Sequence, residues 1–255
     1  MALRSLEKWH GAGNDFLVEV SEHGTAPWWN SQRAKAICDR TTGVGADGLL
    51  LATLGSGVSM VLYNADGSTA EMSGNGIRCL AAAVRRLTAG TWDALDVETE
   101  AGTRTVTLTM DDTSGYGSVA MGEVTFGETL PGTLGVAYVG NPHVVVRDDP
   151  KWSDAMREEL AESLSIDMDG ANVEFVSVEN DAHLTIKVIE RGVGWTKACG
   201  TGSCAVVAVG HRESMCGTDV VVDNPGGALR VTLDAAAVTL SGPVQFVANV
   251  EWLEA

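Results

Sequence analysis

Short apolar or alternating runs bounded by Gly, Asn and Asp recur along this chain, and they predict β-strands. The predicted strands centre on residues 49–51, 59–63, 105–109, 144–146, 173–176, 184–188 and 220–222. Helical periodicity covers residues 31–39, residues 151–164 and the stretches that follow Ser73 and Cys199. Because strands outnumber helices and do not alternate with them one for one, the pattern predicts the α+β fold class.

Two of the predicted helices begin with the same phrase, which reads EMSGNGIRC from Glu71 and ACGTGSCA from Ala198. Apolar residues follow each phrase at helical spacing, namely Ile77, Leu80, Ala81, Val84 and Leu87 in the first copy and Cys204, Val207 and Ala208 in the second. The first helix is expected to stop near Gly90. Because positions 73 and 199 lie 126 residues apart in a chain of 255, we expect two similar halves with a boundary near residues 114–117.

A glycine-rich helix start can hold an anion, because its first N–H groups have no intrahelical acceptor and carry the positive end of the helix dipole. The same field lowers the pKa of a thiol placed just before the helix. Two such starts around one carboxylate would stabilise a carbanion beside it, and a base on each face would invert the stereocentre without a cofactor. One copy alone could be only a turn with close packing. The matched pair favours the functional interpretation.

Net charge narrows the possible partners, because a charge of −17 repels phosphate backbones and anionic lipid heads. We therefore expect neither nucleic acid nor a membrane as partner. The chain has no apolar run of 18 residues and no secretion signal after Met1, which favours a cytoplasmic protein. Its five cysteines lack zinc-module spacing, so we expect free thiols and no metal, with buried packing roles for Cys38, Cys79, Cys204 and Cys216.

The residues Gly43, Gly45 and Gly48 match the spacing of a dinucleotide-binding fingerprint. That fingerprint requires a strand before it and a helix after it. Here a helical pattern precedes and a strand pattern follows, so a dinucleotide site is not expected.

Further motifs lie in one order along nearly the whole chain. They are His10-Gly-Ala-Gly-Asn-Asp-Phe16, Asp39-Arg40 with Gly43-Val-Gly-Ala-Asp-Gly48, Tyr63-Asn-Ala-Asp-Gly-Ser68, Gly140-Asn-Pro-His143, Ala171-Asn-Val-Glu-Phe175 and Glu190-Arg-Gly192. With the two repeated phrases, they resemble the diaminopimelate epimerases, which interconvert LL- and meso-diaminopimelate in lysine and cell-wall biosynthesis.

The resemblance implies two pseudo-symmetric domains, each a β-sheet wrapped around a central helix, with the active site in the cleft between them. The implied domains are residues 1–115 with about 246–255, and residues 116–245. It also implies a cofactor-independent isomerase, an amino-acid substrate (diaminopimelate) and a homodimer.

The resemblance assigns Cys199 as one catalytic base, with His143 and Glu190 tuning its ionisation. Ser73 stands at the position of the family's other catalytic cysteine. Backbone amides of Gly74, Asn75, Gly200 and Thr201 would hold the α-carboxylate. The remaining implied substrate contacts come from Asn14, Asn64, Asn141, Asn172, Glu190 and Arg191. Gly48 departs from the family, which often has Gln there, so a contact from that side chain is absent.

Ser73 is a very poor base, because a thiol ionises near pH ~8.5 and water, as a guide to an alcohol, near ~15.7. At ~1.36 kcal/mol per unit the gap reaches ~10 kcal/mol, and a helix start typically returns only about 0.3–1 kcal/mol of it. We therefore expect impaired inversion. The serine has three interpretations: an engineered substitution that traps substrate, a natural variant that inverts slowly or with the help of water, or a one-base activity. Serine at one base position also resembles some proline racemases and hydroxyproline epimerases.

Two other functions stay open on the sequence. The chain could be a racemase or epimerase of another amino acid, or a non-catalytic amino-acid-binding homologue that kept the site after losing a base.

Overall fold

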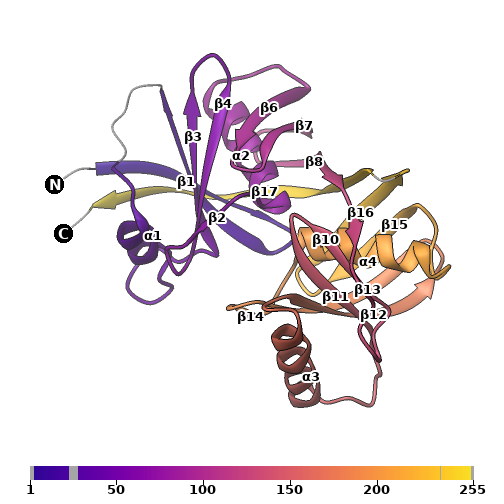
Figure 1. The fold of residues 1–255 in the computed structure, drawn as a ribbon. Coiled ribbons are helices and arrows are strands. Elements are labelled where there is room, and N and C mark those ends of the chain that lie inside the picture. The colour runs from indigo at the N-terminus through magenta and orange to yellow at the C-terminus, as the bar shows by residue number, and fades with distance from the viewer. Residues whose placement is uncertain (1–2, 23–27, 236, 254–255) are drawn as a thin grey trace. The chain divides into compact units, whose positions relative to one another are not determined.

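The computed structural model describes residues 3–22, 28–235 and 237–253. The chain forms two compact units (Figure 1). Unit 1 comprises Met1–Val119 and Gly242–Ala255, and unit 2 comprises Ala120–Ser241.

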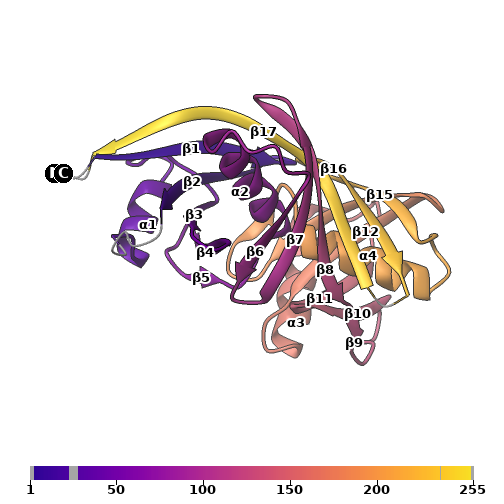
Figure 2. The same ribbon diagram turned by 90° about the horizontal axis from the view of Figure 1, so that it is seen from above.

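Unit 1 surrounds one helix with a ring of paired strands. Its elements are β1 (Leu3–Gly11), β2 (Asn14–Glu22), α1 (Ser31–Cys38), β3 (Gly48–Leu54), β4 (Val58–Asn64), β5 (Thr69–Ala70), α2 (Gly74–Leu87), β6 (Ala94–Thr99), β7 (Gly102–Met110), most of β8 (Ser114–Glu123) and the later part of β17 (Ala237–Leu253). Neighbouring strands pair in the order β17–β1–β2–β3–β4–β6–β7–β8, and β8 pairs with β17. Figures 1 and 2 show α2 lying among these strands.

Helix α2 is buried because its apolar residues line the face that meets the strands. Ile77, Leu80 and Ala81 are fully buried, and the helix contacts β1, β2, β3 and β7. The helix ends at Leu87, which is 52% exposed, three residues before the stop expected at Gly90. Ala89 adopts a positive φ of 49°, which carries the chain out of the helix before the glycine.

Unit 2 repeats this construction. Its elements are β9 (Thr125–Phe126), β10 (Gly135–Val139), β11 (Asn141–Arg147), α3 (Asp154–Asp167), β12 (Asn172–Asn180), β13 (His183–Glu190), β14 (Gly194–Thr196), α4 (Gly200–Arg212), β15 (Asp219–Asn224), β16 (Gly227–Asp234) and the start of β17. The strands pair in the order β9–β10–β11–β12–β13–β15–β16–β17, with β14 beside β13.

The two helices of unit 2 cover opposite faces of β12 (Figure 1). Val173 and Phe175 pack in one cluster with Ala161 and Leu164 of α3. Because side chains alternate along a strand, Glu174 belongs to the other face, where α4 contacts β10, β11 and β12.

The order of elements is the same in the two units. From β1 to β8 and again from β10 to β17, the chain runs two strands, a helix, three strands, a helix and three strands. The parallel pairs also correspond, since β2–β3 and β4–β6 match β11–β12 and β13–β15. The predicted α+β class, with a sheet around a central helix in each half, is confirmed.

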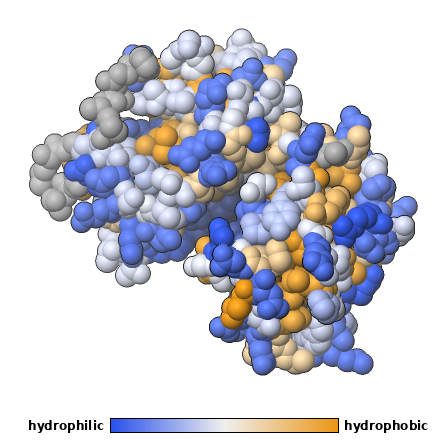
Figure 3. All heavy atoms as spheres, viewed as in Figure 1, coloured by the Kyte–Doolittle hydropathy of each residue, from blue (hydrophilic) through white to orange (hydrophobic). Residues whose placement is uncertain are grey.

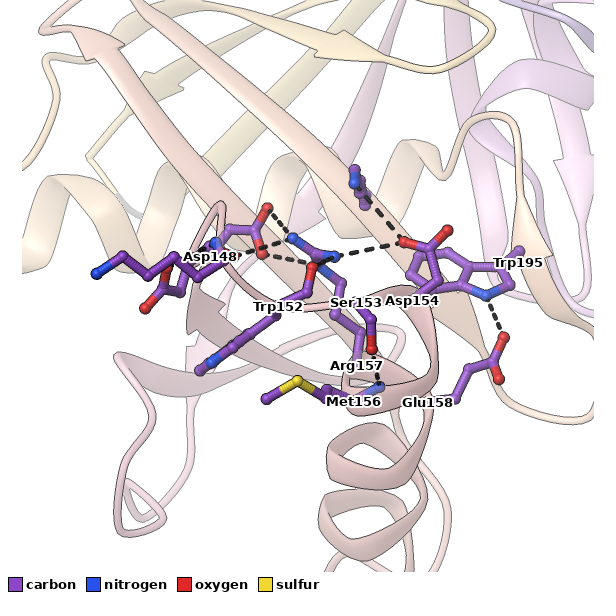
Figure 4. Close-up of polar contacts among 11 residues, drawn as sticks. Asp148, Trp152, Ser153, Asp154, Met156, Arg157, Glu158 and Trp195 are labelled. Carbon is purple, nitrogen blue, oxygen red and sulfur yellow. Dashed lines mark hydrogen bonds and ion pairs between the residues drawn. The ribbon is translucent and has the colours of Figure 1, made fainter.

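Helix α3 begins at Asp154 and not at Lys151 as the sequence pattern indicated. Ser153 Oγ accepts the amide N–H of Met156 at 3.3 Å and caps the helix. Arg157, buried on the first turn, donates to both carboxylate oxygens of Asp148, with Nε 2.8 Å and Nη2 3.1 Å away (Figure 4). These polar contacts fix where α3 starts against its sheet.

The glycine pattern from Gly43 to Gly48 follows α1 and leads into β3, which confirms that it lacks the strand-then-helix context of a dinucleotide site. All five cysteines are free and buried, as expected for the four assigned to packing. None of the helices in the described part of the chain is long and apolar enough to span a membrane. Figure 3 shows mainly hydrophilic residues on its visible face, with apolar patches over the part of unit 2 around α3.

Candidate active site

Cys199 occupies the N-cap of α4, in an extended conformation that precedes the first helical residue. Its Sγ accepts the amide N–H of Gly202 at 3.3 Å and lies 3.5 Å from Thr201 Oγ1. Asn224 Oδ1 accepts the backbone N–H of Cys199 at 3.3 Å. The amides of Gly200 and Thr201, as the first two of the helix, have no intrahelical acceptor and can hold an anion.

Burial raises the pKa of the Cys199 thiol well above its usual value, and the Glu190 and Glu174 carboxylates raise it further. The hydrogen bonds from Thr201 and Gly202 lower that pKa by less. The pKa therefore moves in the direction opposite to the one expected from the helix start alone. Cys199 rests as a neutral thiol, because two acids and a low-dielectric surrounding outweigh the helix dipole.

His143 lies fully buried beside this thiol. Its Nδ1 is 2.7 Å from Glu174 Oε1, and its Nε2 is 3.0 Å from Asn141 Oδ1. A ring nitrogen of His143, a carboxylate oxygen of Glu174 and Sγ of Cys199 lie within 4.8 Å of one another. Nitrogen, oxygen and sulfur donors together also suit a thiophilic metal, but here the imidazole and the carboxylate are engaged with each other. We interpret the group as an acid–base cluster.

Glu190 completes the acidic surroundings of the thiol. Burial raises the pKa of its carboxyl, and Glu174 raises it further, while hydrogen bonds from Thr196 and Cys199 lower it. Thr196 Oγ1 donates to Glu190 Oε1 at 2.6 Å. A carboxyl held this way can exchange a proton with Cys199.

Asn172 and Arg191 meet through a backbone contact, since Asn172 Oδ1 accepts the N–H of Arg191 at 2.9 Å. Asn172 is buried, whereas Arg191 is exposed. Glu190 and Arg191 also line a groove of about 480 Å³ between α3 and the β13–β14 turn. Arg191 therefore offers a guanidinium to a ligand carboxylate at the surface of unit 2.

In unit 1, Ser73 occupies the N-cap of α2 as Cys199 does in α4. Ser73 Oγ accepts the N–H of Gly76 at 3.1 Å, and its carbonyl accepts the N–H of Ile77 at 2.8 Å. The amides of Gly74 and Asn75 begin the helix and have no intrahelical acceptor. The two phrases thus fold into the same local structure.

A chain of side-chain hydrogen bonds lies behind this helix start. Arg78 Nη2 donates to Asn75 Oδ1 at 2.7 Å, Asn75 Nδ2 donates to Asn14 Oδ1 at 3.4 Å, and Asn14 Nδ2 donates to Asp47 Oδ2 at 2.8 Å. Asn64 lies next to these hydrogen-bonded side chains, because the carbonyl of Asp47 accepts the N–H of Ala65, the residue after Asn64, at 3.1 Å. Asn64 Nδ2 itself donates to Ser68 Oγ at 3.0 Å, within its own turn.

The structure thus brings Cys199, His143, Glu190 and Asn141 into one cluster in unit 2, and Ser73, Asn75 and Asn14 into another in unit 1. The sequence reasoning missed Glu174 and Asn224. Glu174 carried a signal, since a carboxylate interrupts the apolar run from Val173 to Val176, on the same strand face as Asn172. Asn224 precedes Pro and Gly and looks like a turn residue, so no local signal marks it.

The family model described as diaminopimelate epimerase matches residues 7–127 and 135–247. The diaminopimelate epimerase of Synechococcus elongatus is 35% identical over 248 residues, which cover 88% of this chain and 89% of that protein. The one of Desulforudis audaxviator is 35% identical over 274 residues, which cover 97% and 99%.

Solved structures share the fold at lower identity. A predicted epimerase from Pseudomonas aeruginosa superimposes with a TM-score of 0.78 at 13% identity, over 99% of this chain and 100% of that one. A hydroxyproline epimerase from Agrobacterium vitis with bound trans-4-hydroxy-L-proline gives 0.73 at 15%, over 98% and 92%. The resemblance carried by the motifs is confirmed, and the chain belongs to the diaminopimelate epimerase family of isomerases.

Proposed function

We propose that this protein interconverts LL- and meso-diaminopimelate by moving the proton at the α-carbon from one face to the other. The observation that carries the proposal is the placement of Cys199, which sits at a helix start within reach of Glu190 and the His143–Glu174 pair. A thiol there can exchange a proton with substrate while the adjacent amides hold the carboxylate.

Cys199 would act as acid and base on one face. Because it rests as a thiol, it protonates the carbanion directly, and it becomes a base once Glu190 accepts its proton. The amides of Gly200 and Thr201 would take the α-carboxylate and the charge that develops on it. His143 would tune this exchange together with Glu190.

The helix start of unit 1 would serve the same substrate from the opposite face. Ser73 stands at the second base position, and the amides of Gly74 and Asn75 would add to the carboxylate seat. Asn14 and Asn64 would orient the substrate through neutral hydrogen bonds. In unit 2, Asn141 and Asn172 would do the same, and Arg191 would bind the distal carboxylate through its bidentate fork.

Inversion in this chain would be slow, because Ser73 cannot supply a thiolate. The hydroxyl would only relay a proton. All three interpretations of the serine predict slow inversion, namely an engineered substitution, a natural slow variant and a one-base activity. They differ in whether inversion at the α-carbon, exchange of the α-hydrogen or neither of these persists.

The domain bounds, cofactor needs, partners and cellular location that we propose are those that the same family implies. The two domains are expected at residues 1–115 with 246–255 and at residues 116–245, and they would each supply one helix start. The proposed enzyme needs no cofactor and no metal, binds neither nucleic acid nor a membrane, and works in the cytoplasm as a homodimer in lysine and cell-wall precursor synthesis.

The decisive experiment compares this chain with Ser73→Cys, Cys199→Ala and a control, Cys216→Ala, which removes a buried thiol elsewhere in unit 2. A coupled assay follows interconversion of the diaminopimelate stereoisomers, and mass spectrometry follows uptake of deuterium from heavy water at the α-carbon. We expect the isomer that presents its hydrogen to Cys199 to exchange faster than it inverts. Ser73→Cys should raise inversion at least about tenfold, the effect of ~1.4 kcal/mol on a barrier.

Four results would redirect the proposal. If exchange of the α-hydrogen persisted in Cys199→Ala, Cys199 would not be the catalytic base on that face. Equal inversion rates in this chain and in Ser73→Cys would refute the account of the serine. Tight binding of diaminopimelate without exchange in any variant would identify a non-catalytic binding protein, and turnover of proline-type or other amino acids alone would identify a different epimerase.

A further inference from the structure

Glu174 is a fully buried carboxylate at the third residue of β12. Burying a charge is costly unless partners satisfy it. Its neighbours on the strand, Val173 and Phe175, belong to the apolar cluster against α3, so the carboxylate lies on the α4 face of the sheet. Because an apolar residue at this position would avoid that cost, we expect the carboxylate to have a role that an apolar residue could not fill.

The contacts of Glu174 are directed to the catalytic cluster. Oε1 lies 2.7 Å from His143 Nδ1, which is its one hydrogen-bond partner among the described residues. Oε2 is buried without a hydrogen-bond partner in the described part of the chain. A methyl group at Gly202 would lie 2.5 Å from Oε1, so the glycine of the repeated phrase leaves the space that this carboxylate occupies.

The carboxylate determines the proton position on His143. An ionised carboxylate only accepts hydrogen bonds, so Nδ1 must carry a proton. Nε2 then faces Asn141 at 3.0 Å. If the amide oxygen of Asn141 is the partner, Nε2 also carries a proton and the ring is a cation; if the amide is flipped, Nε2 accepts. In both cases Nδ1 carries the proton that is directed to Glu174.

We propose that Glu174 is a positioning residue of the site, which holds His143 as the Nδ1-protonated ring with Nε2 turned to Asn141, and which keeps a fixed negative charge beside Cys199. This inference rests on the proposed function, because it gives the pair a task in the same proton exchange. It concerns a group that touches His143 and not the substrate.

The groups that face Glu174 come from each neighbouring element. They are His143 on β11, Glu190 at the end of β13 and Cys199 at the start of α4. Arg157, the buried cation of α3, is engaged with Asp148 on the other face of the sheet. Glu174 raises the pKa of both Cys199 and Glu190, in addition to the larger effect of burial. Its negative charge therefore favours the protonated form of both.

The test compares the unaltered protein with Glu174→Gln, which keeps the shape and an oxygen acceptor but removes the charge. Glu179→Gln, on an exposed position of the same strand, is the matched control. Two readouts need no substrate, so their result is independent of whether diaminopimelate is turned over. The first is ¹⁵N NMR of the His143 ring in the unaltered protein, assigned with His143→Gln. The second is the pH dependence of iodoacetamide alkylation at Cys199, followed by mass spectrometry of its peptide.

We expect the NMR spectrum to show Nδ1 protonated at neutral and mildly alkaline pH. In Glu174→Gln, alkylation of Cys199 should begin at lower pH and be severalfold faster at neutral pH, because the charge that raises the pKa of this thiol is gone. Glu179→Gln should match the unaltered protein. An Nε2-protonated neutral ring, or an unchanged alkylation profile in a folded Glu174→Gln, would overturn the proposal. If Glu174→Gln fails to fold, the NMR measurement on the unaltered protein still decides.

Discussion

His143 and Glu174 form one hydrogen-bonded pair, with Nδ1 and Oε1 2.7 Å apart and both side chains fully buried. They come from the neighbouring parallel strands β11 and β12. Neither group is stable alone in that environment, because a buried carboxylate or imidazolium without a partner loses its solvation and gains nothing in exchange. The pair therefore joins two strands of unit 2 and also forms part of the acid–base surroundings of Cys199.

We predict strong energetic coupling between these two residues. His143→Leu or Glu174→Leu alone should each destabilise the protein by about 3–5 kcal/mol, because each leaves a buried partner uncompensated. The double variant should cost less than the sum of the two. Urea unfolding of the four proteins measures this cycle. Additive costs would show that the two side chains act separately.

Ser73→Cys should separate stability from activity. Ser73 Oγ caps α2 through the N–H of Gly76, and a thiol is a weaker acceptor. We therefore expect Ser73→Cys to lose part of the ~1 kcal/mol that a serine cap contributes, while inversion of diaminopimelate becomes faster. Ser153→Cys, the same change at the cap of α3, should lose similar stability without the gain in activity. A more stable Ser73→Cys would contradict the capping argument.

Much of the fold could be predicted from the sequence, because the repeated phrase and the helical stripes that follow it are local signals. Other strands could not. Leu3–Gly11 mixes charged residues with one large aromatic residue, Trp9, and it becomes β1 only by pairing with β2 and β17. Its partners on β17 lie at the far end of the chain, where local periodicity cannot report them.

The candidate site divides in the same way. Cys199 and Ser73 were predictable, because each leads a helix start that the sequence repeats. The carboxylate of Glu174 within an apolar run was a signal, but its role was not predictable, because that role depends on a contact between β11 and β12. The direction of the Cys199 pKa was also beyond the sequence, since burial and two carboxylates brought by other strands decide it.

Gly202→Ala should damage the site by displacing Glu174. A Cβ there would lie 2.5 Å from Glu174 Oε1 and 3.2 Å from the Cβ of Cys199. We expect a loss of about 1–3 kcal/mol in stability, as for other overpacked interiors, together with slower α-hydrogen exchange. Gly57→Ala is the control, because an added Cβ at that glycine would meet nothing within 4 Å. A Gly202→Ala protein with normal stability would mean that the carboxylate has room to move.

Arg157→Lys should loosen the start of α3. Arg157 Nε and Nη2 hold both oxygens of Asp148, and Nη1 donates to the carbonyl of Trp152 at 2.7 Å (Figure 4). Lysine cannot reproduce this fork, so we expect a loss of roughly 1–3 kcal/mol in urea unfolding. Arg230→Lys, which alters an exposed fork onto Asp219, should cost under about 1 kcal/mol. Equal costs at the two sites would show that burial does not matter here.

We predict that the protein loses stability at alkaline pH because of its buried thiols. Burial raises the pKa of Cys79 to about 12, whereas an unfolded thiol ionises near ~8.5. Above the unfolded value only the unfolded chain releases this proton, so the free energy of unfolding falls as pH rises toward the folded value. Between pH ~8.5 and ~10 the loss is about 2 kcal/mol for this one group.

Cys79→Ala should cost stability at neutral pH through its cavity, but the gap to the unaltered protein should close by that amount at pH ~10. Val84→Ala, a buried truncation on the same helix without a titrating group, should keep a constant gap when urea unfolding is measured under reducing conditions. Parallel curves for Cys79→Ala would mean that this thiol ionises equally in the folded and unfolded chain.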